Sequence, residues 1–137
     1  MRFKTSMKPA LLGFGLMAIV AAAPAMAGNV YVIAHSSVEL TQAELREVYL
    51  GDKQFVDPVK LAPTDNAAVQ ADFLEKVIAM EASKYGALWT KKGFRSGLAA
   101  PAIKAGDAEV INFVRKTPGA VGYVSEPAQG VKLLYKY

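Results

Sequence analysis

The sequences NVYVIAH at residues 29–35 and TQAELREVYLG at residues 41–51 follow one another closely and have different periodicities. The first is a run of β-branched and aromatic residues without helical spacing. Gly28 bounds it on one side, and Ser36 and Ser37 bound it on the other. This composition predicts a buried first strand.

The second sequence has the signals of a helix that begins at Thr41 and ends at Gly51. Thr41 and Glu44 have the spacing of a capping box, in which the hydroxyl and the carboxylate each bond an otherwise unpaired backbone N–H. Leu45 and Val48 belong to one apolar face, and glycine favours the left-handed conformation that ends helices. A strand followed by an amphipathic helix begins an α/β pattern.

The same alternation continues to the C-terminus. We expect a short strand over residues 58–62 and then a long helix that Thr64, Asp65 or Asn66 caps. The remaining expected elements are helices over residues 81–94 and 107–117, a Gly- and Ala-rich connector over 97–106, and strands over 120–124 and 131–135. The expected fold is therefore α/β, with a mostly parallel sheet whose ligand sites lie beyond the carboxyl ends of strands.

The first 27 residues have the three parts of a secretory signal peptide. A basic N-terminal region precedes an apolar run at residues 10–23, which is too short to span a bilayer comfortably. The small-residue motif Ala25-Met26-Ala27 then predicts cleavage before Gly28. We expect a mature periplasmic domain over residues 28–137; the alternative is an uncleaved membrane anchor.

The formal charge of +4 comes mostly from this leader. Three of the 16 basic residues lie in it, which leaves 13 basic against 12 acidic residues and a net charge of +1 for the mature chain. Such a surface lacks the one-sided positive field of a nucleic-acid binder. No later apolar run is long enough to cross a membrane.

Few residues of the chain are suited to catalysis. Cysteine is absent, which removes disulfides and thiol chemistry, and His35 is the only histidine. A metal site lacks a second soft ligand, and no cofactor motif occurs. We therefore expect a protein that is not an enzyme, binds no cofactor and holds no metal; a hydrolase that uses His35 is the remaining enzymatic hypothesis.

Two segments have the composition of an anion site. Thr64, Asp65 and Asn66 stand where the long helix is expected to open, and free N–H groups and the positive end of the helix dipole attract anions there. Arg95 belongs to a second segment, KKGFRSG at residues 91–97, with three cations around glycines. The alternatives are plain helix capping for the first segment and a solvated basic helix end for the second.

Four features follow one another along the chain: LREVYLG at residues 45–51, Phe73, Trp89 and PGAVGYV at residues 118–124. Their order resembles that in the phosphate-binding proteins of ABC importers. The resemblance implies a single three-layer lobe of the type 2 periplasmic-binding fold. Trp89 is expected in the core, with stacking on a partner as the alternative.

The sequence departs from this family in its anion loop and its length. Pro63 stands where the family has an arginine, and Ala67 and Val69 replace hydroxyl side chains, so that only Asp65 is kept. The mature length supplies about one lobe of a two-lobed clamp. Both departures remove contacts that hold an oxyanion.

The resemblance implies an exported, non-catalytic solute-binding module whose inherited ligand is phosphate or a similar oxyanion, weakly bound. Thr64, Asp65, Asn66 and Arg95 would lie on the ligand side, with Ser36 and Ser37 as additional donors. The alternative is an envelope protein-interaction or accessory subunit that kept the fold and lost small-molecule binding.

Overall fold

A computed structural model describes residues 28–137. The expected signal peptide, its cleavage motif and the alternative membrane anchor lie outside these residues. Within the described part of the chain, no helix combines the length and apolar character needed to cross a membrane.

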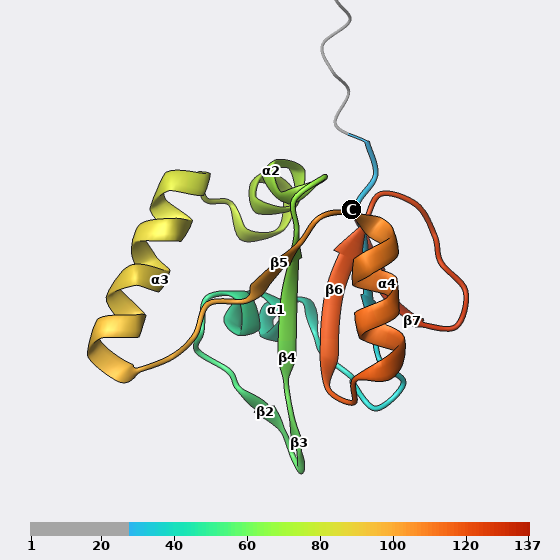
Figure 1. Cartoon of the computed structure of the whole chain (residues 1–137), viewed down its shortest axis with the longest axis horizontal. Coiled ribbons are helices and arrows are strands. Elements are labelled where there is room, and N and C mark those ends of the chain that lie inside the picture. The colour runs from blue at the N-terminus through green and yellow to red at the C-terminus, as the bar shows by residue number, and fades with distance from the viewer. Residues whose placement is uncertain (1–27) are drawn as a thin grey trace, which may run out of the picture.

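A five-stranded sheet with the order β5-β4-β6-β1-β7 forms the centre of the molecule (Figure 1). Its strands are β1 (Tyr31–Ala34), β4 (Ala62–Asn66), β5 (Ala102–Lys104), β6 (Ala120–Val124) and β7 (Lys132–Lys136). β4 pairs in parallel with β5 and β6, whereas β1 pairs antiparallel with β6 and β7. Four strands therefore point the same way and β1 alone is reversed, which confirms the mainly parallel α/β sheet.

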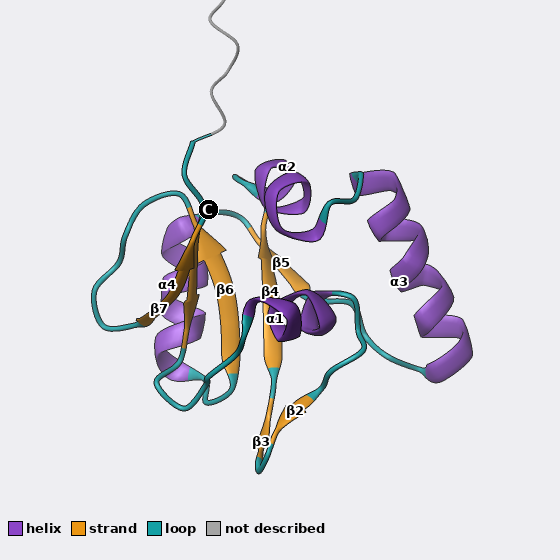
Figure 2. Cartoon of the chain, turned by 180° about the vertical axis from the view of Figure 1, so that it is seen from behind, coloured by secondary structure: helices purple, strands orange, loops and turns teal. Residues whose placement is uncertain are grey.

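Helices cover both faces of the sheet and make the lobe three-layered. α1 (Gln42–Tyr49) lies on one face, together with α2 (Gln70–Phe73) and the π-helical turn η1 (Leu74–Ile78) that continues it. α4 (Asp107–Lys116) covers the opposite face, as the two views show (Figures 1 and 2). α3 (Ala82–Ser96) lies to the side of the sheet, beyond β5.

Each face of the sheet has its own apolar core. The larger core contains Val32 of β1, Leu45 of α1, Phe73 of α2 and Trp89 of α3. The smaller core joins Ile33 and the buried residues of α4 to Val124. Consecutive residues of β1 and β6 thus point into opposite cores, and every residue of β6 is buried.

The expected capped helix after the first strand is confirmed. The Glu44 backbone N–H donates to the Thr41 hydroxyl at 3.1 Å, and the Thr41 N–H donates to the Glu44 carboxylate at 2.9 Å. Gly51 follows the helix with a φ of 81°, in the left-handed region. A Cβ at Gly51 would stand 2.8 Å from the Trp89 ring, so the glycine also allows α3 to approach.

The segment expected to open the long helix is a strand. Two short strands, β2 (Phe55–Val56) and β3 (Val59–Lys60), form a hairpin before it, and the chain then continues as β4 from Ala62 to Asn66. Pro63 does not end β4, because residues 64–66 pair with β5. β5 lies in the expected connector, so the partner that makes β4 a strand was not evident from the sequence.

The expected long helix is consequently shorter and begins later. α2 starts at Gln70, and the π-helical turn η1 ends at Ile78, where Ala79 takes a left-handed φ of 58°. Helix α3, by contrast, extends slightly beyond the expected residues 81–94: it runs to Ser96, and Gly97 caps it.

Candidate functional site

β4 ends at the carboxyl edge of the parallel strands, where ligand sites of α/β sheets usually lie. Thr64, Asp65 and Asn66 are its last three residues, and all three are buried. Such polar side chains are buried only when they find hydrogen-bond partners. Their partners come from β5, β6, α3 and α4.

Asp65 is the centre of a buried carboxylate–tyrosine cluster. The hydroxyl of Tyr123 donates to one carboxylate oxygen at 2.8 Å, and the hydroxyl of Tyr85 donates to the other at 2.9 Å. Tyr123 belongs to β6 and Tyr85 to α3, so the carboxylate links the sheet to the helix at its side. Both of its oxygens are therefore already engaged.

Burial raises the pKa of the Asp65 carboxyl, and the hydrogen bonds from Tyr123, Tyr85 and Gln70 lower it in part. Burial likewise raises the pKa of Tyr123 and of Tyr85, and the neighbouring carboxylate adds to both shifts. The two phenols consequently stay protonated and act as donors toward Asp65 at neutral pH.

Thr64 and Asn66 also bond within the protein. The Thr64 hydroxyl donates to the Ala102 carbonyl at 2.6 Å and thereby ties β4 to β5. The Asn66 amide donates to Asp107 at 2.8 Å and to the Tyr123 carbonyl at 3.0 Å, and its oxygen accepts the Ala68 N–H at 2.9 Å. Neither side chain caps a helix.

Asp107, the first residue of α4, also belongs to the polar side chains at the carboxyl edge of the sheet, which we call the polar edge. Besides Asn66, its carboxylate accepts the backbone N–H of Ser125 and the Ser125 hydroxyl, the latter at 2.7 Å. Sequence reasoning missed Asp107 and Ser125, and it gave Tyr85 and Tyr123 no polar role. These hydrogen bonds form only because β4, β6 and α4 lie next to one another in the folded chain.

A hollow of about 440 Å³ lies beside Asp65, between the end of β4 and α3. Its polar lining comes from Asp65, Gln70, Tyr85 and Thr90, and its apolar lining includes Trp89. Among residues 28–137, no lysine, arginine or histidine lines it. A carboxylate without a facing cation disfavours a negatively charged ligand.

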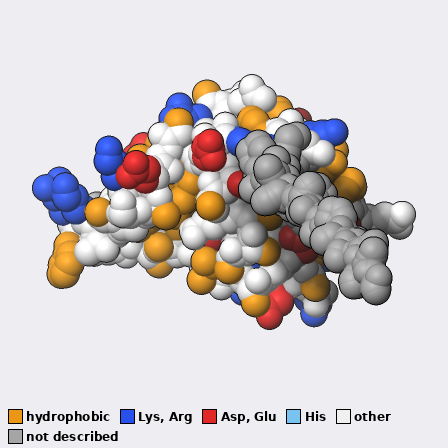
Figure 3. Space-filling view, turned by 90° about the horizontal axis from the view of Figure 1, so that it is seen from above, with side chains coloured by type: hydrophobic (Ala, Val, Ile, Leu, Met, Phe, Trp, Pro, Cys, Tyr) orange, Lys and Arg blue, Asp and Glu red, His pale blue; other side chains and the backbone are white. Residues whose placement is uncertain are grey.

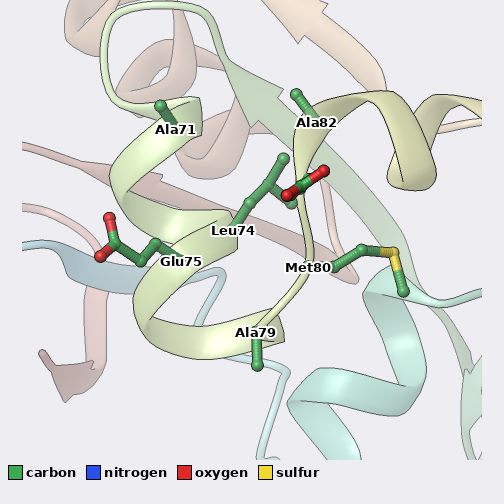
Figure 4. Close-up of a pocket in the computed structure, with 7 residues that line it drawn as sticks. Ala71, Leu74, Glu75, Ala79, Met80 and Ala82 are labelled. Carbon is green, nitrogen blue, oxygen red and sulfur yellow. The ribbon is translucent and has the colours of Figure 1, made fainter.

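A second hollow of about 440 Å³ lies between η1 and the start of α3 (Figure 4). Leu74, Ala79 and Met80 give it apolar walls, and Glu75 and Glu81 are its charged residues. In the close-up, Glu75 points away from Ala82 and Met80. In the described part of the chain no cation lines this hollow either, so it lacks the charged donors that favour an oxyanion.

Two solved structures have the same fold as this chain. The first is a proposed phosphate ABC transporter substrate-binding protein from Clostridium perfringens with bound phosphate; it matches 79% of this chain at a TM-score of 0.57 and 13% identity. The second is an ABC-type phosphate transport receptor from Vibrio cholerae, which matches 79% of the chain at a TM-score of 0.50 and 14% identity. This chain has the fold of phosphate ABC transporter substrate-binding proteins.

The chain corresponds to less than half of each of these substrate-binding proteins. The matched part covers 45% of the Clostridium perfringens protein and 46% of the Vibrio cholerae protein. Comparison of the sequence with protein-family models gives no match, and comparison with curated proteins gives none either. The likeness to the substrate-binding proteins therefore concerns the fold.

The sequence predicts six ligand-binding residues, and the structure does not bring all six of them together. Thr64, Asp65 and Asn66 share the carboxyl edge, but Arg95 lies near the end of α3 and does not line the hollow beside Asp65. Ser36 and Ser37 follow β1, whose reversed direction puts them at the opposite edge of the sheet. Their common role in ligand binding stays a prediction.

Asp65 makes the stability of this lobe depend on pH. Burial raises the pKa of Asp65 in the folded protein above its unfolded value of about 3.9. The contribution of this carboxyl to the free energy of unfolding is therefore fully present below about pH 3.9, and it is lost as pH rises through the folded-state pKa. We expect the stability of the wild type relative to Asp65→Asn to fall as pH rises from about 4 to 7. Urea denaturation of both proteins at each pH measures this difference.

Glu44 provides a control of opposite sign. A hydrogen bond from the Thr41 backbone N–H lowers the pKa of Glu44 most, and a hydrogen bond from Lys53 lowers it further. The contribution of Glu44 to the stability is therefore lost as pH falls. The stability of the wild type relative to Glu44→Gln should therefore rise over the same interval. Equal slopes for the two variants would contradict the buried-carboxylate assignment.

Proposed function

We propose that this chain is an exported, non-catalytic binding module, formed by a single lobe, whose inherited ligand is phosphate or a similar oxyanion. The observation that carries the proposal is the fold it shares with a protein solved with bound phosphate, and a hollow opens at the carboxyl edge of its parallel strands. Ligand sites in open α/β sheets lie at this edge. Residues 1–27 support export to the periplasm.

The charge around Asp65 supports weak binding. Tyr85 and Tyr123 each donate to one carboxylate oxygen, and no cation among the described residues lines the hollow. Each missing charged hydrogen bond removes about 1.5–3 kcal/mol, and an open site also weakens electrostatic contacts. Two such bonds correspond to a loss of more than about a hundredfold in affinity.

The arrangement around His35 supports a module without catalysis. Its Nδ1 lies 2.8 Å from the Ser37 hydroxyl and accepts the Ser37 backbone N–H at 3.1 Å. The Ser37 hydroxyl also accepts the Gly119 N–H at 3.1 Å. Histidine and serine are thus part of the turn after β1, and the turn is stabilised by both.

Calorimetric titration with phosphate, sulfate and molybdate tests the binding proposal. We expect dissociation constants above about 1 μM, because the charged contacts of a tight oxyanion site are missing. Gln70→Ala should weaken phosphate binding further, whereas Lys84→Gln on the outer face of α3 should leave it unchanged. Saturable nanomolar binding would contradict the weak-site argument.

The surface of α3 favours a second candidate function, docking to a protein partner with an acidic surface. Lys84, Lys91 and Arg95 lie on one outer face of this helix and line a groove of about 540 Å³. Within residues 28–137 none of these three cations forms an ion pair or hydrogen bond, whereas the neighbouring Lys92 pairs with Asp52 at 2.7 Å. Phe94 is 87% exposed. Basic side chains lie beside an exposed hydrophobic one where α3 ends, at the left of Figure 3.

Capture of partners from periplasmic extract distinguishes the two functions. A stoichiometric partner that is retained by the wild type and lost from Lys91→Gln/Arg95→Gln supports docking through α3. Trp89 is unsuitable as a probe, because it is buried and donates from Nε1 to the Tyr49 carbonyl at 3.1 Å. Thermal stabilisation by phosphate without a captured partner supports the binding module instead.

A further inference from the structure

A hollow of about 540 Å³ lies at the edge of the sheet opposite Asp65. Its lining comes from the turn after β1, the last turn of α4 and the start of β7, and its polar residues are His35, Ser36, Arg115 and Lys132. Within residues 28–137, no carboxylate lines it. Its charge is therefore opposite to that of the hollow beside Asp65.

Internal hydrogen bonds hold the two cations in place. The Arg115 guanidinium donates from two nitrogens to the Gln129 carbonyl, from Nε at 3.1 Å and from the second nitrogen at 2.5 Å. A Cβ at Gly130 would stand 2.9 Å from Arg115 Nε, so the glycine lets the loop close on the guanidinium. Lys132 donates to the Val38 carbonyl at 3.0 Å and pairs with Glu39.

The histidine in this hollow presents a donor. Because His35 Nδ1 accepts the backbone N–H of Ser37, the proton of the neutral ring lies on Nε2. The hydroxyl of Ser36 bonds to no other group in the described part of the chain. Imidazole N–H and hydroxyl are both able to donate to an acceptor in the hollow.

The charge balance leaves Arg115 available. Glu39 offsets the charge of Lys132 from an exposed position at the rim, with 81% of its side chain exposed. Arg115 pairs with no carboxylate among residues 28–137, and its contact with a backbone carbonyl leaves its charge uncompensated. Arginine binds carboxylate and phosphate groups through parallel N–H donors.

We propose that this hollow binds a small oxyanion, a carboxylate or phosphate group, through Arg115, the Nε2–H of His35 and the Ser36 hydroxyl. Lys132 also lines the wall, where Glu39 offsets its charge. Since the protein already holds Arg115 and His35 in place, little side-chain entropy is lost on binding. The site is independent of the proposed ligand site at the carboxyl edge.

Nuclear magnetic resonance titration of the ¹⁵N-labelled protein tests this site. Sodium phosphate and sodium acetate are added in separate arms at constant ionic strength. Saturable shifts of the His35 ring and Arg115 Nε–H resonances with either anion support the site, and the arm that saturates identifies the phosphate or the carboxylate group. Shifts that follow the ions without saturation would overturn it.

Two variants and a control make the result specific. Arg115→Gln should weaken binding by at least about tenfold, since a charged hydrogen bond is lost. His35→Ala should weaken binding by at least about twofold. This second variant keeps Arg115 in place, so it tests the site even where Arg115→Gln does not fold. Lys136→Gln removes a cation from the far end of β7 and should change nothing. Saturable shifts confined to Gln70 and Thr90 would overturn this proposal and support the carboxyl-edge site.

Discussion

Replacement of Phe73 by alanine is expected to lower the free energy of unfolding by about 3–5 kcal/mol. Phe73 is fully buried and stacks on Tyr123 with ring centroids 3.8 Å apart. It also makes a T-shaped contact with Tyr49, with ring centroids 4.7 Å apart. Alanine leaves a cavity between α2 and the sheet and removes both aromatic contacts. Urea denaturation followed by circular dichroism measures the loss.

Phe94→Ala is the matched control for this variant. Its ring is 87% exposed near the end of α3, so its truncation should change the stability by less than about 0.5 kcal/mol. A single lobe of this size has a total stability of about 5–15 kcal/mol, and Phe73→Ala therefore removes a large share of it. Equal losses for the two phenylalanines would contradict the packing described here.

Asp65→Ala is expected to destabilise the protein by about 2–4 kcal/mol. The substitution leaves the hydroxyls of Tyr85 and Tyr123 without their acceptor, and each unpaired buried group costs about 1–3 kcal/mol. Removal of a buried charge offsets part of this loss at neutral pH. Thermal and urea denaturation give the magnitude.

A triple variant separates unpaired hydroxyls from lost packing. Asp65→Ala/Tyr85→Phe/Tyr123→Phe removes the carboxylate together with both groups that bond it. We expect it to be more stable than the sum of its three single substitutions predicts, because no buried hydroxyl remains unpaired at this place. Strict additivity would show that the cluster does not act as a unit.

The polar edge illustrates why the candidate site was only partly predictable. The sequence indicates Asp65 through its place in a polar segment after a strand and through its resemblance to the anion loop of phosphate-binding proteins. Its partners Tyr85 and Tyr123 follow it by 20 and 58 positions. Their spacing has no local signature, since one stands in a helix and the other in a strand. The hollow with Arg115 was missed for the same reason, because β1, α4 and β7 supply its residues.

By itself, the sequence determined those elements whose signals are local. The capping box at Thr41 and the apolar runs of β1 and β6 each specify their own backbone, and together they predict an α/β lobe. Only the tertiary structure decided that residues 62–66 form a strand and that β1 runs against its neighbours. β4 depends on hydrogen bonds to β5, about 40 residues away, and strand direction depends on which edges meet in the sheet, so neither is encoded in a short window of residues.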